Sequence, residues 1–551
     1  MAQGHVRLGV ERPDQDAATP GGQAGTHERA RIVTRQQSRL DTDAPAQRAV
    51  ISFHGVFDPT PATPSRMPIT RSFENLTARS ALRRALTLLA VGLAATVPAR
   101  AHAQQAGSPT VPARRPLAII HATIHTMKDS IPIRDGTIVV DGGRIVSVGA
   151  GSTIKVPANA RVVDASGKFV IPGLWDMHVH TAVPDGASLL GLYIANGVTG
   201  VRDMGGDFAV IRRWREEIRG GKRTGPRIVA SGPYVQGGDA ALPHFVVRTP
   251  EQAQAAVDSL AGLGVDFVKV HAMVPRDAFF ALARAARARG LPLAGHLQTD
   301  VTVEEAADSG QRSLEHLDGF LNPCSTADSV RLSAAYPLDL AVLGQCSTSD
   351  QTPIYRHIAA RPTWVTPTFI ALEMLAALPK ERLPSDTLVH YLPPTLRAAM
   401  AAALEIPPDM PADASVLGRA LWTKRLAVVK GLAQNGVPIL AGTDAPLPNS
   451  IPGFGMHAEL EALVRAGLSP WRALRTATAE PARYFVSDTV GTVCAGCVAD
   501  LVVLNADPLR DIRNTRRIAL VVADGRAYSP TALAALRESA LRAARSGAKS
   551  Q

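Results

Sequence analysis

Short apolar runs separated by turn residues occur near both ends of the chain. Residues 117–170 alternate in this way, with turn signals such as Asp141-Gly142-Gly143 between the runs, and the same texture returns only within residues 486–530. Runs of this length between turn residues are typical of antiparallel strands. We therefore expect residues 115–170 and 486–530 to pair into one small β-sandwich.

The middle of the chain, residues 171–485, alternates apolar strand-like runs with helical stretches. Strand-like runs cover 198–202, 226–231, 266–270, 293–296, 313–316, 363–367 and 438–444, and helices are predicted over 275–289 and 302–309. Alternation of strands with helices indicates an α/β fold with a parallel sheet. An open doubly wound sheet shares this rhythm, but a span of about 310 residues fits a (β/α)8 TIM barrel with insertions.

Two further segments complete the predicted organisation. Residues 320–430 are poor in clear strands and hold two Pro-Pro pairs, so we expect a long insertion over the barrel mouth in this range. Residues 531–551 are expected to form a C-terminal helix or tail. At 551 residues the chain is too long for a single hydrophobic core, which stops growing near roughly 250–300 residues.

The front of the chain has the layout of a secretory signal. Residues 1–66 are polar and lack apolar periodicity, so they are expected to be disordered or an upstream translation artefact. From Met67 onward come a basic stretch, an apolar run over 85–97 and the small-residue triplet that ends at Ala103. A membrane-spanning helix needs about 20 apolar residues. We predict a signal peptide from Met67, cleavage after Ala103, a periplasmic or secreted protein and no permanent membrane anchor.

Composition and charge exclude several classes of protein. The chain is 46% hydrophobic and 19% charged, which is ordinary for a globular protein and excludes a fibrous or wholly disordered one. The formal net charge is +11, but residues 1–103 hold 13 basic against 8 acidic side chains. The remainder shows no long basic run with interleaved aromatic residues, so no nucleic-acid partner is expected.

The four cysteines form two candidate pairs. Cys494 and Cys497 make a lone C-x-x-C, while Cys324 and Cys346 flank an irregular segment. A zinc knuckle would need a second close pair, and a redox-active C-x-x-C would open a helix, whereas this one lies in a strand-like region. In an exported chain, we expect two disulfides that pair 324 with 346 and 494 with 497.

An H-x-H motif is the strongest chemical signal. His178 and His180 close a strand-like run over 171–180, and residues two apart in a strand point to the same side. Two neutral imidazoles on one side form a ready site for zinc-like ions.

Further ligand types end other predicted strands, where a barrel carries its chemistry. Lys269, His296, His316 and Asp444 each close an apolar run. Taken singly, His296 could cap a helix and Lys269 could extend from a strand end to solvent. Several such residues in series are a stronger signal than any one of them.

With these motifs, the chain resembles the amidohydrolase superfamily, in particular its imidazolonepropionase-like and Xaa-Pro dipeptidase-like branch. The resemblance covers residues 115–530 and includes the family-like stretches 453–470 and 499–509. It implies that His178, His180 and Asp444 hold one divalent metal ion and that His296 and His316 hold a second. Zinc is the first candidate among metals that N/O ligand sets accept.

The resemblance also implies a carboxylated Lys269 that bridges the two ions, because a free ammonium has no lone pair to offer a metal. Two ions would lower the pKa of a shared water toward about 7. Asp444 would act as the catalytic group that accepts the proton of this water and passes it to the leaving amine.

Two further histidines are candidate substrate contacts. His271 lies two residues after Lys269, and His244 lies in a loop. The resemblance is imperfect here, because many dipeptidase-like members carry Gly-Gly-His where this chain reads Gly237-Gly238-Asp239. This departure weakens the direct transfer of a proline-dipeptide substrate.

We therefore expect a hydrolase that cleaves a C–N amide bond in a dipeptide, an N-acyl amino acid or a cyclic amide. The partner is thus a small-molecule or short-peptide substrate, and a homo-oligomer is compatible with the sequence. The alternatives are an esterase, lactonase or phosphotriesterase on the same centre, and a non-catalytic ligand-binding barrel. Substrate profiling separates the first group, and an Asp444→Asn variant separates the second.

Overall fold

The computed structural model describes residues 115–240, 242–320, 350–376, 386–403, 414–447 and 449–546. The predictions for residues 1–66, for the signal peptide over 67–103 and for the pairing of Cys324 with Cys346 lie outside these residues. No helix among the described residues is long and apolar enough to cross a membrane.

The two ends of the described chain share one eight-stranded sheet. Its order is β17-β16-β15-β5-β1-β2-β3, with β4 paired to β1. The strands are β1 (Leu117–Ile124), β2 (Ile133–Asp141), β3 (Arg144–Ala150), β4 (Arg161–Asp164), β5 (Phe169–Pro172), β15 (Leu501–Leu504), β16 (Ile518–Ala523) and β17 (Arg526–Tyr528). Antiparallel pairing of β5 with β15 joins the ends. The expected pairing of the two ends is present, whereas the sandwich arrangement stays a prediction.

The middle of the chain forms parallel sheets. One sheet has the order β6-β7-β8 and another has the order β10-β9-β11-β12-β13-β14. The strands are β6 (Leu174–Val179), β7 (Val198–Asp203), β8 (Arg227–Ala230), β9 (Tyr234–Gln236), β10 (His244–Val246), β11 (Val268–Val270), β12 (Leu293–Gly295), β13 (Gln311–Glu315) and β14 (Trp364–Thr366). Every pair of neighbours within these two sheets is parallel.

A short segment, residues 438–445, lies between β14 and β6. The Leu440 amide donates to the Val365 carbonyl at 2.9 Å, and the Met177 amide donates to the Ala441 carbonyl at 2.9 Å. The described strands thus give a TIM-barrel-like α/β arrangement, but they make two sheets and isolated bridges instead of one continuous ladder. The interruptions lie at β8, which is paired only to β7 among the described strands, and at residues 438–445, which make only the isolated bridges Val365↔Ile439 and Val179↔Ala445.

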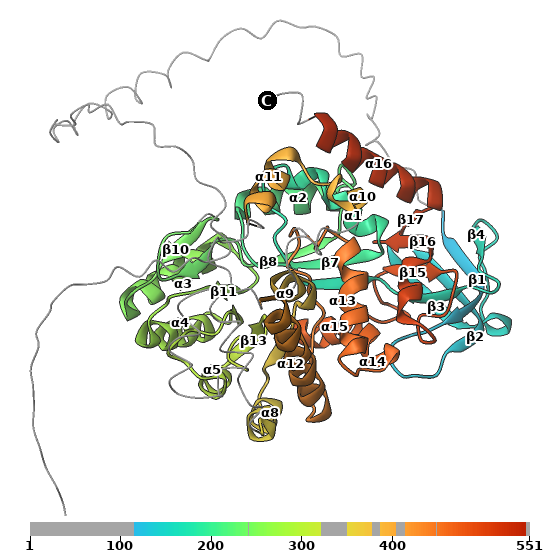
Figure 1. Cartoon of the computed structure of the whole chain (residues 1–551). Helices are drawn as coiled ribbons and strands as arrows, with labels where there is room; N and C mark the ends of the chain where they lie inside the picture. Colours follow the sequence, from blue (N-terminus) through green and yellow to red (C-terminus); the bar gives the residue numbers. More distant parts are fainter. Residues whose placement is uncertain are drawn as a thin grey trace, which may run out of the picture. The chain divides into compact units, whose positions relative to one another are not determined.

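Helices follow most of the parallel strands (Figure 1). They include α1 (Leu190–Ala195), α2 (Phe208–Arg219), α3 (Pro250–Leu263), α4 (Arg276–Ala288), α5 (Val303–Ser309), α13 (Phe454–Arg465), α14 (Pro470–Thr476) and α15 (Ala479–Phe485). Helix α5 begins with a capping box in which Thr302 and Glu305 satisfy each other's backbone amides. Helix α4 buries Phe279 and Leu282, and both belong to the same large core as Val268 of β11. The predicted helices over 275–289 and 302–309 are therefore confirmed within a residue or so.

The range 320–430, where an insertion is expected, also holds the strand-like run predicted over 363–367. Its described part contains β14, which pairs in register with β13, so this range supplies a strand of the parallel sheet. It also contains α8 (Thr352–Ala359), α9 (Phe369–Ala376), α10 (Asp386–Val389), α11 (Pro394–Ala403) and most of α12 (Ala414–Gln434). The strand-like run predicted over 363–367 is therefore confirmed, whereas an insertion over the barrel mouth stays a prediction. At the far end, α16 (Pro530–Ser546) is the helix expected for the C-terminal segment.

Candidate metal centre

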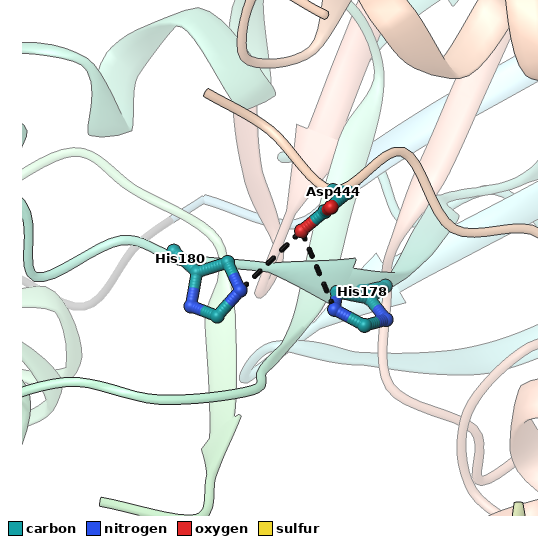
Figure 2. Close-up of side chains that lie close together, drawn as sticks. All are labelled: His178, His180 and Asp444. Atoms are coloured by element: carbon teal, nitrogen blue, oxygen red, sulfur yellow. Dashed lines mark ion pairs between the residues drawn. The ribbon is translucent and has the colours of Figure 1, made fainter. Parts of the chain in front are cut away.

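Strand β6 and the segment after residue 441 bring three ligand-type side chains together. His178, in β6, and His180, just after the end of β6, both lie against Asp444 (Figure 2). Asp444 Oδ1 lies 3.4 Å from His178 Nε2 and 3.3 Å from His180 Nε2. One ligand atom of each residue lies within 4.8 Å of the others, and all three residues are buried. This geometry suits a divalent metal ion, which imidazole nitrogens and a carboxylate oxygen would hold.

Hydrogen bonds between β6 and residues 443–444 fix the position of Asp444. Buried Asp176 of β6 accepts hydrogen bonds from the Thr443 hydroxyl at 2.6 Å and from the Thr443 amide at 3.0 Å. The Asp444 amide donates to the His178 carbonyl at 2.7 Å. Asp444 itself has a φ of 57°, in the left-handed region that non-glycine residues adopt rarely. The surrounding bonds hold the carboxylate against the imidazole pair despite this strain.

The outer nitrogen of each of the four predicted histidine ligands has an oxygen partner. Nδ1 of His178 contacts Glu315 at 2.8 Å, Nδ1 of His180 contacts the Gly205 carbonyl at 3.1 Å, Nδ1 of His316 contacts Thr368 Oγ1 at 2.7 Å, and Nδ1 of His296 contacts Asp318 at 3.0 Å. In the neutral form of each imidazole, these acceptors assign the proton to Nδ1 and leave the lone pair on Nε2. Metal-binding histidines are oriented in this manner.

His316 and His296 lie beside the three-residue cluster. The ring centroid of His316 is 4.5 Å from that of His178, and the His296 centroid is 4.6 Å from that of His316. The structure therefore places all four histidines in one row, while the tight cluster holds only His178, His180 and Asp444.

Lys269 of β11 is 1% exposed, and its Nζ has no hydrogen-bond partner among the described residues. Burial lowers its pKa to about 8, although the carboxylates of Glu315 and Asp444 oppose this shift. A buried amine without a partner is costly, so its retention here calls for a further group. The ligand set and this amine together fit a metal centre.

Charges in the centre favour metal-binding protonation states. Burial and the nearby Lys269 ammonium lower the pKa of His178 to about 3. Burial likewise brings the pKa of His316 well below its usual value. For Asp444 burial favours the neutral acid, but the His178 imidazole and the hydrogen bond from His180 hold its pKa well below the usual range. At neutral pH the imidazoles of His178 and His316 are neutral and Asp444 is ionised, as metal ligation requires. For His180 burial lowers the pKa, but the hydrogen bond to Asp444 and the charge of this carboxylate raise it above its usual value, so metal binding would displace a proton from His180.

Arg202 and Glu315 are candidate site residues that the sequence reasoning missed. Both are fully buried, and Arg202 donates to the two Glu315 oxygens at 2.8 and 3.0 Å. Glu315 in turn contacts His178, so Arg202, Glu315 and His178 form one chain of charge-assisted bonds. The sequence does contain an indication, because Arg202 ends the apolar run 198–202. Such a run is expected to be buried, and a buried charge needs a partner.

The two candidate substrate contacts continue the row of rings. The His271 centroid lies 4.6 Å from that of His296 and 4.9 Å from that of Tyr234, and His244 lies 5.9 Å from Tyr234. His244 also contacts the Leu242 carbonyl through Nδ1 at 2.9 Å. Both histidines thus lie outside the three-residue cluster. His271 is next to His296, and His244 is separated from His271 by Tyr234.

Cys494 and Cys497 are bonded to each other, with their Cα atoms 5.3 Å apart. They lie in turn and coil structure before β15, so the expectation of a strand-like region was wrong. The turn around Gly496, which has a φ of 84°, explains this difference. Both cysteines pack against the core of the eight-stranded sheet.

Comparison with known proteins gives the same family for most of the chain. A model of the amidohydrolase family matches residues 169–528. A solved Bifidobacterium longum structure assigned as a prolidase is 26% identical and covers 78% of this chain and 100% of its own, with a TM-score of 0.57. A bottromycin amidohydrolase is 25% identical and covers 80% of this chain and 94% of its own, with a TM-score of 0.63.

Curated relatives match only short segments. An imidazolonepropionase of Alkaliphilus metalliredigens is 42% identical over 57 residues, which are 10% of this chain and 14% of that protein. A dihydroorotase of Trichlorobacter lovleyi is 47% identical over 47 residues, which are 8% of this chain and 11% of that protein. The match thus spans little more than a tenth of these relatives, whereas the family model spans both the H-x-H motif and Asp444.

Proposed function

Because this chain belongs to the amidohydrolase family, we propose that it hydrolyses a C–N amide bond in a short peptide, an N-acyl amino acid or a cyclic amide. The buried cluster of His178, His180 and Asp444 is the observation that carries this proposal. A prolidase assignment and a bottromycin amidohydrolase among the similar structures support amide chemistry.

The proposed cofactor is a pair of divalent metal ions, with zinc as the first candidate. His178, His180 and Asp444 would hold one ion, and His296 and His316 would hold the other. Such ions, when bound, supply a water of lowered pKa and polarise the scissile carbonyl. The Nδ1 partners of the four histidines support this assignment, since they direct the Nε2 lone pairs to metal.

Lys269 is the proposed bridging ligand in its carboxylated form. Its neutral amine would attack carbon dioxide, form an N–C bond and lose one proton, which gives an anionic carbamate. The lowered pKa of this amine supports the step, because the neutral form is the nucleophile. A carbamate would also provide the buried Nζ with the group that it lacks among the described residues.

The chain's own residues would divide the remaining work. Asp444, ionised and buried, accepts the proton of the attacking water and returns it to the leaving amine. The Glu315 carboxylate accepts a hydrogen bond from Nδ1 of His178, and the charge of Arg202 keeps Glu315 ionised. His271 and His244 are proposed to contact the substrate, because they extend the row of rings away from Asp444.

Two structural proposals accompany this function. We propose that the parallel strands and residues 438–445 complete a (β/α)8 barrel, supported by the isolated bridges Val365↔Ile439 and Val179↔Ala445. We also propose export to the periplasm or beyond the cell, supported by the pattern of residues 67–103 and by the bond between Cys494 and Cys497, which forms in oxidising compartments.

The test combines metal analysis with substrate profiling. Purified protein should contain two equivalents of divalent metal and release amine from dipeptides, N-acyl amino acids or cyclic amides. Asp444→Asn should abolish this release, while Asp511→Asn, at a carboxylate 36% exposed and paired with Arg513, should not. Turnover of esters, lactones or phosphotriesters with none of amides would overturn the proposal, as would an unchanged rate in Asp444→Asn.

A further inference from the structure

A cavity lies at the amino ends of the parallel strands β13 and β14. Its volume is about 690 Å³, and it is lined by Arg312 near the start of β13, by Trp364 at the start of β14 and by residues 436–439. The metal ligands lie at the other ends of the same strands, where His316 follows β13 and Asp444 follows residue 441. The cavity is therefore separate from the candidate metal centre.

The lining of this cavity is strongly cationic, and we call it the cationic cavity. Its charged side chains are one carboxylate, Glu480, and six cations, namely Lys128, Arg312, Arg361, Arg472, Arg475 and Arg483. Glu480 pairs with Arg475 at 2.8 Å and with Arg483 at 2.5 Å, so one carboxylate is shared between two guanidinium groups. Arg361 has its partner, Asp308, outside the lining. The cavity keeps an excess of positive charge.

Several of these guanidinium groups are held in place without being neutralised. Arg472 donates to the Ala433 carbonyl at 3.0 Å, and Arg312 donates to the Tyr484 carbonyl at 2.9 Å. Backbone carbonyls orient a guanidinium but carry no net charge. Two further arginines rest on indole rings, with Arg475 4.9 Å from the Trp471 centroid and Arg483 5.3 Å from the Trp364 centroid.

We propose that the cationic cavity binds a compact multivalent oxyanion of the phosphate class, such as a phosphate- or diphosphate-bearing small molecule. Planar guanidinium groups match phosphate oxygens in pairs, and charge-assisted bonds of this kind are strong. The volume lies within the range of about 300–1,000 Å³ of small-molecule sites. The indole faces already carry arginines, so the cavity selects for charge and not for a stacked aromatic group. This inference is independent of the proposed hydrolytic function.

The test uses inorganic pyrophosphate as the probe and the full metal-loaded enzyme. Calorimetry at low salt should show one pyrophosphate site, with citrate at least tenfold weaker. In Lys128→Gln/Arg472→Gln, whose two side chains are exposed, the affinity for pyrophosphate should fall by roughly tenfold or more. A second variant, Arg483→Gln, should weaken binding as well, because it removes one cation of the lining. The Arg483 guanidinium is 62% exposed, and Glu480 keeps its ion pair with Arg475, so the fold should tolerate this change.

Two controls distinguish binding in the cationic cavity from nonspecific electrostatic binding and from binding at the metal centre. Arg513→Gln/Arg542→Gln removes two equally cationic, exposed side chains elsewhere and should leave the affinity within about twofold. His180→Ala disrupts the metal centre and should also leave pyrophosphate binding in place. Loss of binding in His180→Ala with full binding in Lys128→Gln/Arg472→Gln would overturn the proposal, as would tighter binding of citrate than of pyrophosphate.

Discussion

At the carboxyl ends of β13 and β14, Glu315, His316 and Thr368 surround the candidate metal centre, whereas Arg312 and Trp364 at the amino ends line the cationic cavity. Charges at the first end are buried: Arg202 pairs with Glu315, whereas the Lys269 amine has no hydrogen-bond partner among the described residues and has a lowered pKa. Charges at the second end lie closer to solvent and carry a cationic excess. A buried charge is thus either paired or disfavoured, while a charge near solvent can remain in excess.

The largest expected effect is the loss of turnover at the buried end. Asp444→Asn removes the group proposed to move the proton, and kcat should fall by roughly 10²–10⁴-fold. Lys128→Gln/Arg472→Gln at the cationic cavity is the matched control and should keep kcat within about twofold. Steady-state kinetics on the best amide substrate measures both. An equal loss of kcat in the two variants would contradict the claim that only the carboxyl ends of the strands carry the turnover.

The next effect concerns the buried chain from Arg202 to His178. Glu315→Gln leaves Arg202 without its carboxylate and should lower the free energy of unfolding by about 3–5 kcal/mol. It should also weaken metal binding by about 10–100-fold, since the carboxylate that accepts the Nδ1 proton of His178 is replaced by a weaker, neutral acceptor. Urea unfolding and metal titration measure these changes.

The control for Glu315 is the half-buried pair of Arg223 and Glu217. Glu217→Gln should cost at most about 1 kcal/mol and leave metal affinity unchanged. If Glu315→Gln bound metal as wild type does, the proposed support of His178 would be wrong.

The pH dependence of metal-free protein gives a smaller effect. The pKa of Lys269 in the folded chain, about 8, lies below the usual value of 10.5 for a lysine in the unfolded chain. Between these values the unfolded chain binds a proton that the folded chain does not, so stability rises with pH from 8 to 10.5. The contribution is up to about 1.4 kcal/mol per pH unit and should vanish in Lys269→Met, but not in exposed Lys430→Met. If the free energy of unfolding of Lys269→Met depended on pH between 8 and 10.5 as that of the wild type does, the lowered pKa of the buried Lys269 amine would be wrong.

The smallest effect is expected for stability at the cationic cavity. Lys128→Gln/Arg472→Gln changes two exposed side chains, so the free energy of unfolding should stay within about 0.5 kcal/mol of wild type. Removal of like charges could even raise it slightly. Thermal unfolding checks this, and a loss of several kcal/mol would mean that these cations belong to the structural core.

Sequence reasoning captured the elements that carry strong local patterns. The helices α4 and α5, the strands β6 and β7 and the pairing of the two chain ends follow from apolar periodicity and turn residues. The apolar run over 363–367 likewise predicted β14, although that strand is only three residues long. The sequence reasoning was wrong about Cys494 and Cys497, which it placed in a strand-like region where the structure has a turn.

By itself, the sequence determined which residue types end the strands, and hence that His178, His180, Lys269, His296, His316 and Asp444 would share one edge of a parallel sheet. Only the tertiary structure decided their grouping into a tight cluster of three with two histidines alongside. It alone joined Arg202 to Glu315 and gathered cations from six separate positions around one cavity. The physical reason is that strand periodicity acts over a few residues, whereas charge pairing joins positions more than a hundred residues apart and depends on register and burial.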